Sequence, residues 1–114
     1  MKVFGLKSCD TVRKAMKELK AAGYAPELVD IRETPLEISD LERFFAAFGE
    51  ALVNRRSTTW RGLSEEERAG DPIRQISAHP SLMKRPVIAA ESRLTLGWAA
   101  DSRAEWLGKA GQDA

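Results

Sequence analysis

Residues 2–23 read KVFGLKSCDTVRKAMKELKAAG, and this stretch decides the fold. The short apolar run 2–6 is followed by the polar pair Lys7-Ser8, which suits a buried strand better than a helix. Beyond Cys9, apolar residues recur at helical spacing, charged residues fill the opposite face, and Gly23 supplies a stop. The sequence therefore predicts a strand followed directly by an amphipathic helix, with Cys9 at the helix entry.

The next segments continue the alternation of strand and helix. Residues 27–31 read ELVDI and follow at the spacing of a right-handed βαβ crossover, which predicts a second strand parallel to the first. Ser39 and Glu42 form a capping-box pair that predicts the start of a second helix, and Gly49 predicts its end. We expect the aromatic stripe of this helix, which includes Phe44, to lie in the core.

The middle of the chain predicts short helices. Residues 52–63 are polar and basic without a clear period, which indicates a loop with at most a short helical turn. The pair Ser64 and Glu67 predicts a capping box, and Asp71-Pro72 predicts a further helix start. We expect that last helix to stop at His79-Pro80, with His79 in a structural role at the helix end.

The C-terminal part predicts a hairpin and a final helix. Residues 87–90 and 93–98 predict antiparallel strands that turn at Glu91-Ser92. Ser102 with Glu105 predicts the cap of the last helix, in which Trp106 packs on the core, and the tail 108–114 is expected to fray.

This order of elements predicts a thioredoxin-like α/β fold. It consists of a mixed four-stranded sheet with flanking helices and an inserted helical segment at about residues 36–80. The chain of 114 residues is too short for two ordinary domains and long enough to bury a core without disulfides. We therefore expect a single domain over residues 1–114.

The composition excludes several classes of protein. A formal net charge of +1 gives no electrostatic reason to expect nucleic acid or an anionic membrane as a bulk partner, since both need a concentrated basic surface, and it leaves open a local anion site. No apolar run reaches the roughly 18 residues that span a bilayer, and the N-terminus is too short for a signal sequence. We expect a cytoplasmic protein and, as the default for a small domain, a monomer.

Cys9 is the residue that indicates chemistry. At the start of a helix its sulfur would lie near unpaired backbone N–H groups, where the helix dipole favours a thiolate and lowers the pKa of the thiol. Lys7 and Arg13 are close in sequence, and Arg85 would join them. The alternative is a small, buried, inert thiol, where free cysteines usually sit. One cysteine and one histidine are too few for the usual metal site, so no metal is expected.

The pair Arg85-Pro86 favours the reactive thiolate over the buried, inert thiol. In thioredoxin-like folds a proline just ahead of the third strand, commonly in the cis form, faces the cysteine loop. The alternative is an ordinary trans turn, which most X-Pro bonds adopt.

Three segments resemble a known family. They are CDTVRKA at residues 9–15, LVNRRSTTWRGL at residues 52–63 and HPSLMKRPVI at residues 79–88. In this order and spacing they are similar to the ArsC/Spx family, most closely its YffB-type branch, over residues 3 to about 107. The resemblance implies a redox thiol at Cys9. In the glutaredoxin-linked arsenate reductases it implies a cycle in which the thiolate attacks an oxyanion, glutathione forms a mixed disulfide, and glutaredoxin restores the thiol.

The chain departs from the family pattern at several positions. Of three arginines around the oxyanion in the arsenate reductases, only Arg85 is matched, while Asn54 and Leu96 occupy the other two positions. Gly5 stands where the family has a histidine. Val12 holds the second position of the C-x-x-C pair of Spx-type transcription factors, so that disulfide switch is absent.

These observations select the candidate site residues. Arg55, Arg56 and Arg61 form the densest basic patch and would hold the carboxylates of glutathione or an oxyanion, although such a patch is as often a solvated loop. Trp60 would offer a flat face in the same cleft or pack the loop onto the core. We predict Cys9 and Arg85 as catalytic, and we predict binding of substrate or glutathione by Lys7, Arg13, Asn54, Arg55, Arg56, Thr59, Trp60, Arg61 and Pro86.

Three functions are consistent with the sequence. The first is a thiol oxidoreductase that reduces a small, arsenate-like oxyanion or a disulfide, without a bound cofactor, using glutathione as co-substrate and glutaredoxin as partner. The lone cysteine suits this cycle, because the resolving thiol must come from outside. The second is a non-catalytic module that binds a transcription-related partner such as RNA polymerase, as Spx-like relatives do. The third is a relative with weak, promiscuous reductase activity.

Overall fold

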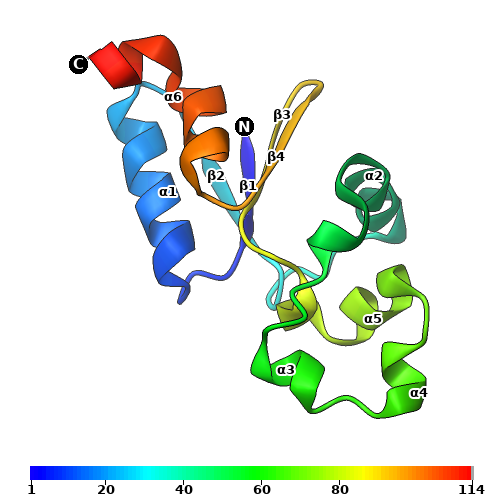
Figure 1. Ribbon diagram of the computed structural model, residues 1–114. Coiled ribbons are helices and arrows are strands. Elements are labelled where there is room, and N and C mark those ends of the chain that lie inside the picture. The colour runs from blue at the N-terminus through cyan, green and yellow to red at the C-terminus, as the bar shows by residue number, and fades with distance from the viewer. Residues whose placement is uncertain (114) are drawn as a thin grey trace. The chain divides into compact units, whose positions relative to one another are not determined.

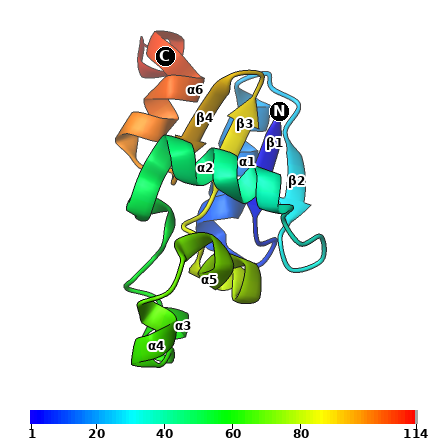
Figure 2. The ribbon, with the colours of Figure 1, turned by 90° about the vertical axis from the view of Figure 1, so that its right-hand side faces the viewer.

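The computed structural model describes the backbone of residues 1–113 and the side chains of residues 1–108 (Figures 1 and 2). The chain forms two compact units. The first unit comprises Met1–Asp30 and Arg85–Ala114, and the second comprises Ile31–Lys84. The expectation of a single domain over residues 1–114 stays a prediction.

The first unit is built on a mixed four-stranded sheet. Its strands are β1 (Lys2–Gly5), β2 (Glu27–Asp30), β3 (Val87–Ala90) and β4 (Arg93–Leu96), in the spatial order β2-β1-β3-β4. β2 runs parallel to β1, whereas β3 is antiparallel to both β1 and β4. The predicted α/β fold class, parallel crossover and terminal hairpin are confirmed.

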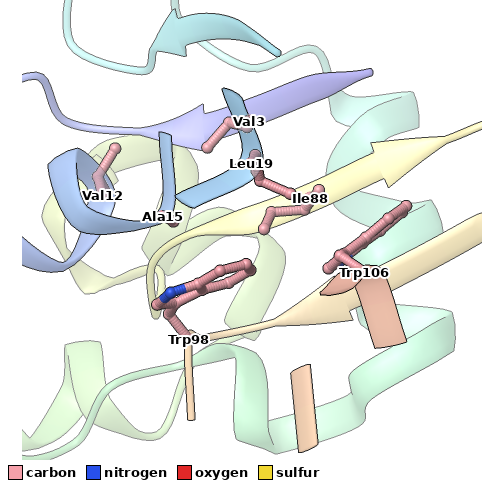
Figure 3. Packing of buried hydrophobic residues seen from close by; sticks show 7 residues of the cluster. All are labelled: Val3, Val12, Ala15, Leu19, Ile88, Trp98 and Trp106. Carbon is pink, nitrogen blue, oxygen red and sulfur yellow. The ribbon is translucent and has the colours of Figure 1, made fainter. Parts of the chain in front are cut away.

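Two helices complete this unit, α1 (Asp10–Ala21) and α6 (Ala100–Asp113). α1 contributes Val12, Ala15 and Leu19 to a core cluster with the sheet residues Val3 and Ile88. Trp98 and Trp106, both from the C-terminal part of the sequence, belong to the same cluster, which Figure 3 shows. Trp106 thus packs on the core as the sequence predicts, and Trp98 is buried with it.

The approach of α1 to the sheet depends on a glycine. A Cβ atom at Gly5 would lie 2.6 Å from Cγ2 of Val12, a side chain that is fully buried. Only a residue without a side chain fits there unless the helix or the strand moves. Gly5 therefore sets the distance between β1 and the helix that carries Cys9.

The second unit contains the predicted helical insert. Its α-helices are α2 (Ile38–Phe48), α3 (Thr58–Arg61), α4 (Glu65–Arg68) and α5 (Pro72–Ala78), with the 3₁₀ turns η1 (Gly49–Leu52) and η2 (Pro80–Leu82). Two backbone hydrogen bonds join its first and last turns, from Asn54 N to Leu82 O at 2.7 Å and from Lys84 N to Leu52 O at 2.8 Å. As predicted, Phe44 is fully buried and Gly49 ends α2, with a positive φ of 60°.

The predicted helix caps are correct in the middle of the chain. Ser64 and Glu67 form a capping box at the start of α4, and Asp71 caps α5 ahead of Pro72. His79 lies at the end of α5, where its ring is 3.4 Å from a carboxylate oxygen of Glu67.

Two other predicted caps are wrong. α2 begins at Ile38 with Glu37 as its N-cap, so Ser39 lies inside the helix. α6 begins at Ala100, and the Ser102 hydroxyl donates instead to the carbonyl of Leu96 at 2.8 Å. In both cases the helix begins before the serine that the capping pattern predicts, so that serine is not the N-cap.

The predicted fraying of residues 108–114 stays a prediction. The helix continues to Asp113 with a single non-helical residue, Gly108, at a φ of 63°. A positive φ is readily adopted by glycine, so Gly108 breaks the helix without ending it. Ala114, the last residue of the predicted tail, lies outside the described residues.

No helix in the described part of the chain is long and apolar enough to cross a membrane.

Candidate active site around Cys9

Cys9 is held rigidly at the N-terminus of α1. It is the N-cap residue, with an extended backbone at φ −81° and ψ 122°. Its N–H donates to the carbonyl of Leu6 at 3.0 Å, and its own carbonyl accepts from the N–H of Arg13 at 3.0 Å. The side chain is partly buried and packs against the core cluster of the first unit. The sulfur is therefore fixed by the scaffold and still reachable from solvent.

The surroundings of Cys9 favour the thiolate. Burial raises the pKa of the Cys9 thiol, but the backbone N–H of Val12, the side chain of Arg85 and the backbone N–H of Thr11 lower it by more. The positive charge of Arg85 adds to this effect, and the pKa lies below its ordinary value. These N–H groups belong to the first turn of α1, where the helix dipole favours negative charge.

The sheet explains why Arg85 meets Cys9. In the antiparallel pairing of β1 with β3, Phe4 lies opposite Val87. The residues that precede Val87 therefore lie beside the residues that follow Phe4, at the end of β1 where the chain turns toward Cys9. Arg85 and Pro86 occupy this place, joined by a cis peptide bond. The structure thus brings Arg85 to Cys9, and a ligand-binding role of Pro86 stays a prediction.

Lys7 and Arg13 hold the cysteine loop in shape. The N–H of Lys7 donates to a carboxylate oxygen of Asp30 at 3.0 Å, and its carbonyl accepts from Nε of Arg13 at 3.0 Å. The guanidinium of Arg13 also lies 3.9 Å from the carboxylate of Asp10. The cationic side chain that lowers the pKa of Cys9 is Arg85. Ligand binding by Lys7 and Arg13 stays a prediction.

The other predicted binding residues all belong to the second unit. The guanidinium of Arg55 lies 5.4 Å from the ring centroid of Trp60 and 3.5 Å from a carboxylate oxygen of Glu50. The hydroxyl of Thr59 is 2.8 Å from that of Ser81, a hydrogen bond between α3 and η2. Arg55 and Trp60 therefore form a stacked pair, while Thr59 stabilises the local fold.

The remaining three residues surround this pair in sequence. The side-chain oxygen of Asn54 accepts from the N–H of Arg56 at 3.1 Å, and the carbonyl of Arg61 accepts from Arg68 at 2.7 Å. The Arg56 and Arg61 side chains are exposed. A ligand-binding role for these second-unit residues stays a prediction.

Two features of the site escaped the sequence reasoning. The N–H groups that act on the sulfur belong to Thr11 and Val12, and only the general rule for helix starts pointed to them. Asp30, at the end of β2, fixes the cysteine loop through Lys7, and a carboxylate after an apolar strand is the signal that could have indicated it. Among the described residues, no group of three or more His, Cys, Asp and Glu side chains is arranged to hold a metal ion.

Comparison with known proteins agrees with this geometry. The chain matches the family model described as "ArsC family" over residues 4–106. It is 36% identical over 101 residues to an uncharacterised protein of Haemophilus influenzae, covering 84% of this chain and 89% of that one. It is 28% identical over 104 residues to an arsenate reductase of Neisseria meningitidis, covering 85% of this chain and 89% of the relative.

Solved structures show the same fold. The structure of the YFFB protein superposes with a TM-score of 0.85 and 31% identity, covering 94% of this chain and 98% of that chain. An arsenate reductase-related protein of Brucella melitensis gives a TM-score of 0.71 and 30% identity, covering 94% and 93% of the two chains. With its family match across nearly the whole length, its fold and its cysteine at the start of α1, this chain belongs to the ArsC family.

Proposed function

We propose that the protein is a thiol oxidoreductase in which Cys9 is the nucleophile and Arg85 stabilises its thiolate. The observation that carries the proposal is the meeting of Arg85 with a helix-start cysteine whose pKa is lowered. A thiolate is the reactive form of cysteine toward disulfides and electrophilic oxyanions. The arsenate reductase relatives support the same class of reaction.

The reaction with a disulfide begins with attack of the Cys9 thiolate on one of the two sulfurs. A new S–S bond forms to Cys9, the substrate S–S bond breaks, and the second sulfur leaves as a thiolate. A glutathione thiolate then attacks the mixed disulfide and releases Cys9.

With an oxyanion substrate, Cys9 replaces one hydroxyl group on the central atom. Glutathione attacks the Cys9 sulfur, the electron pair of the broken bond stays on the central atom, and that atom leaves reduced. A mixed disulfide of Cys9 with glutathione remains, and a second thiol, proposed to be that of glutaredoxin, frees the Cys9 thiolate. In either case Arg85 would hold negative charge beside the sulfur.

The proposal places the protein in the cytoplasm, where a reduced glutathione pool supplies the resolving thiol. The chain has one cysteine, so a resolving thiol has to come from another molecule.

The first test measures the pKa of Cys9. Thiolate ultraviolet absorbance and the rate of alkylation by iodoacetamide are followed against pH for the full chain and for Arg85→Gln. We expect a pKa below that of a free thiol and a rise of that pKa in Arg85→Gln, with Arg85→Lys in between. A wild-type pKa at or above that of free cysteine would contradict the proposal.

The second test concerns glutathione. Oxidised glutathione is added to the full chain, and mass spectrometry follows the mixed disulfide at Cys9 and its removal by glutaredoxin. We expect rapid formation and removal, with Cys9→Ser as the unreactive control. Formation no faster than with an unfolded cysteine peptide would argue against catalysis.

A second candidate function has one observation in its favour. The chain is 27% identical over 106 residues to the Global transcriptional regulator Spx 2 of Oceanobacillus iheyensis, covering 88% of this chain and 78% of that protein. A binding module of this kind would keep its cellular role in Cys9→Ser. If that substitution abolishes the role, binding alone does not explain the protein.

A further inference from the structure

A basic groove lies along α1 in the first unit and runs on from the cysteine loop, with which it shares Lys7, Val12 and Arg13. It is a cavity of about 370 Å³ whose apolar lining comes from Val12, Met16 and Leu28. The cations that line it are Lys7, Arg13, Lys17 and Lys20. We call these seven residues the α1 groove; the helix is drawn in blue in Figure 1.

The helical repeat explains this arrangement. Arg13, Lys17 and Lys20 are spaced at i, i+4 and i+7, so they lie along one side of α1 over roughly 10 Å. Val12 and Met16 form the neighbouring row, which faces the sheet. Leu28 comes from β2, the edge strand, where it pairs with Val3 of the core cluster. The α1 groove is thus an apolar strip at the sheet edge, bordered by positive charge.

Two of the four cations of the α1 groove, Lys17 and Lys20, carry its unpaired charge among the described residues. Lys17 and Lys20 are exposed, and no carboxylate of the described residues forms an ion pair with either. The carboxylate of Glu18, on the same helix, is instead bonded to Arg103 and Trp98. Since the whole chain has a formal net charge of only +1, this concentration of cations is a local feature.

We propose that the α1 groove is a docking surface for an acidic, amphipathic segment of a partner protein. The apolar side chains of such a segment would cover Met16 and Leu28, which are only partly buried, while its carboxylates would pair with Lys17 and Lys20. A nucleic-acid backbone would leave the apolar strip uncovered. Lys7, at one end of the α1 groove, precedes Cys9 by two residues, so a segment bound there lies beside the start of α1. This inference does not rest on the proposed redox function.

The test uses a designed peptide as the probe. A fluorescein-labelled amphipathic helix, with leucine on one face and glutamate on both flanks, is titrated with the full chain by fluorescence anisotropy. We expect binding that weakens with salt, and a loss of about tenfold in Lys17→Glu/Lys20→Glu because two attractive charges become repulsive. The matched control is Lys2→Glu/Lys14→Glu, which makes the same change in net charge with exposed lysines outside the α1 groove and should bind within about twofold of wild type.

The site of binding is read by NMR on the isotope-labelled protein. We expect the amides of the α1 groove to shift when the peptide is added, and Cys9→Ser to bind as well as the wild type. Retained binding in Cys9→Ser separates this surface from the proposed catalysis, so that either can fail alone. Circular dichroism confirms that each variant is folded.

Five results would overturn the inference. Four of them are equal weakening in both double variants, equal binding of a peptide with lysine flanks, tighter binding of a DNA duplex than of the acidic peptide, and amide shifts outside the α1 groove. The fifth is displacement of the peptide by glutathione, because the groove would then be a small-molecule site.

Discussion

The two units of this protein place their candidate functional residues in opposite ways. In the first unit, Cys9 and Arg85 are far apart in sequence and are brought together by the pairing of β1 with β3. In the second unit, Arg55 and Trp60 are close in sequence and stack on one another within a segment of short helices. The position of Arg85 beside Cys9 therefore depends on strand pairing in the sheet. The position of Arg55 beside Trp60 depends on the local turns of the short helices. Changes to the sheet and to the turns should therefore have separate effects.

The largest expected effect on stability comes from Gly5→Ala. The added methyl group would lie 2.6 Å from Cγ2 of Val12, so α1 has to shift from β1, and we expect the free energy of unfolding to fall by about 1–3 kcal/mol. Urea unfolding measures this loss. Reactivity of Cys9 should change with it, because the same helix carries the sulfur.

Gly62→Ala is the matched control in the second unit. A Cβ atom there would lie 3.5 Å from the carbonyl oxygen of Thr58, an ordinary contact, and the backbone is in the right-handed helical region. We expect no loss of stability, or a gain of about 0.4–1 kcal/mol. Equal destabilisation by the two substitutions would break the distinction between the sheet and the turns.

Ser64→Ala should cause the next largest loss of stability. We expect this loss to be confined to the second unit. It removes the hydroxyl that accepts from the N–H of Glu67 at 3.1 Å, and a lost N-cap costs about 1 kcal/mol. Urea unfolding gives the change in stability, and the alkylation rate of Cys9 reports on the first unit. A large change in that rate would show that the α4 cap supports the site.

A smaller effect is expected from the charge of Cys9, because its side chain is partly exposed. The folded state lowers the pKa of the thiol, so the thiolate stabilises the protein above the pKa of the unfolded chain, and this contribution is lost as the pH falls through the folded-state pKa. The stability of the wild type relative to Cys9→Ser should therefore rise with pH across that window. Urea unfolding of both proteins at several pH values measures it, and a difference that is constant with pH would count against a stabilised thiolate.

The smallest effect is expected from Arg55→Gln. The substitution removes the cation over the partly buried Trp60 ring and the exposed pairing with Glu50, so we expect a loss of about 0.5–1 kcal/mol at most. Tryptophan fluorescence during unfolding reports on this loss. If Arg55 binds a ligand instead, glutathione affinity would fall in this variant while stability stays unchanged.

The helix caps show how far sequence reasoning reaches. The Ser-x-x-Glu pattern occurs three times, and only Ser64 is a cap. Ser39 lies inside α2, and Ser102 bonds to Leu96. The pattern is reliable where a short exposed helix has little else to define its start. It fails for the two longer helices, α2 and α6, which begin before the serine of the pattern.

The sequence by itself determined the alternation of strands and helices, the helical insert and the place of Cys9 at a helix start, because periodicity, turns and a cysteine between strand and helix are local signals. Only the tertiary structure decided that Arg85 is the cation that acts on the sulfur, that Gly5 sets the distance of α1 from the sheet, and that Leu28 joins Lys17 and Lys20 in one groove. Each of these depends on strand pairing or helix packing between residues distant in sequence, and no local pattern contains that information.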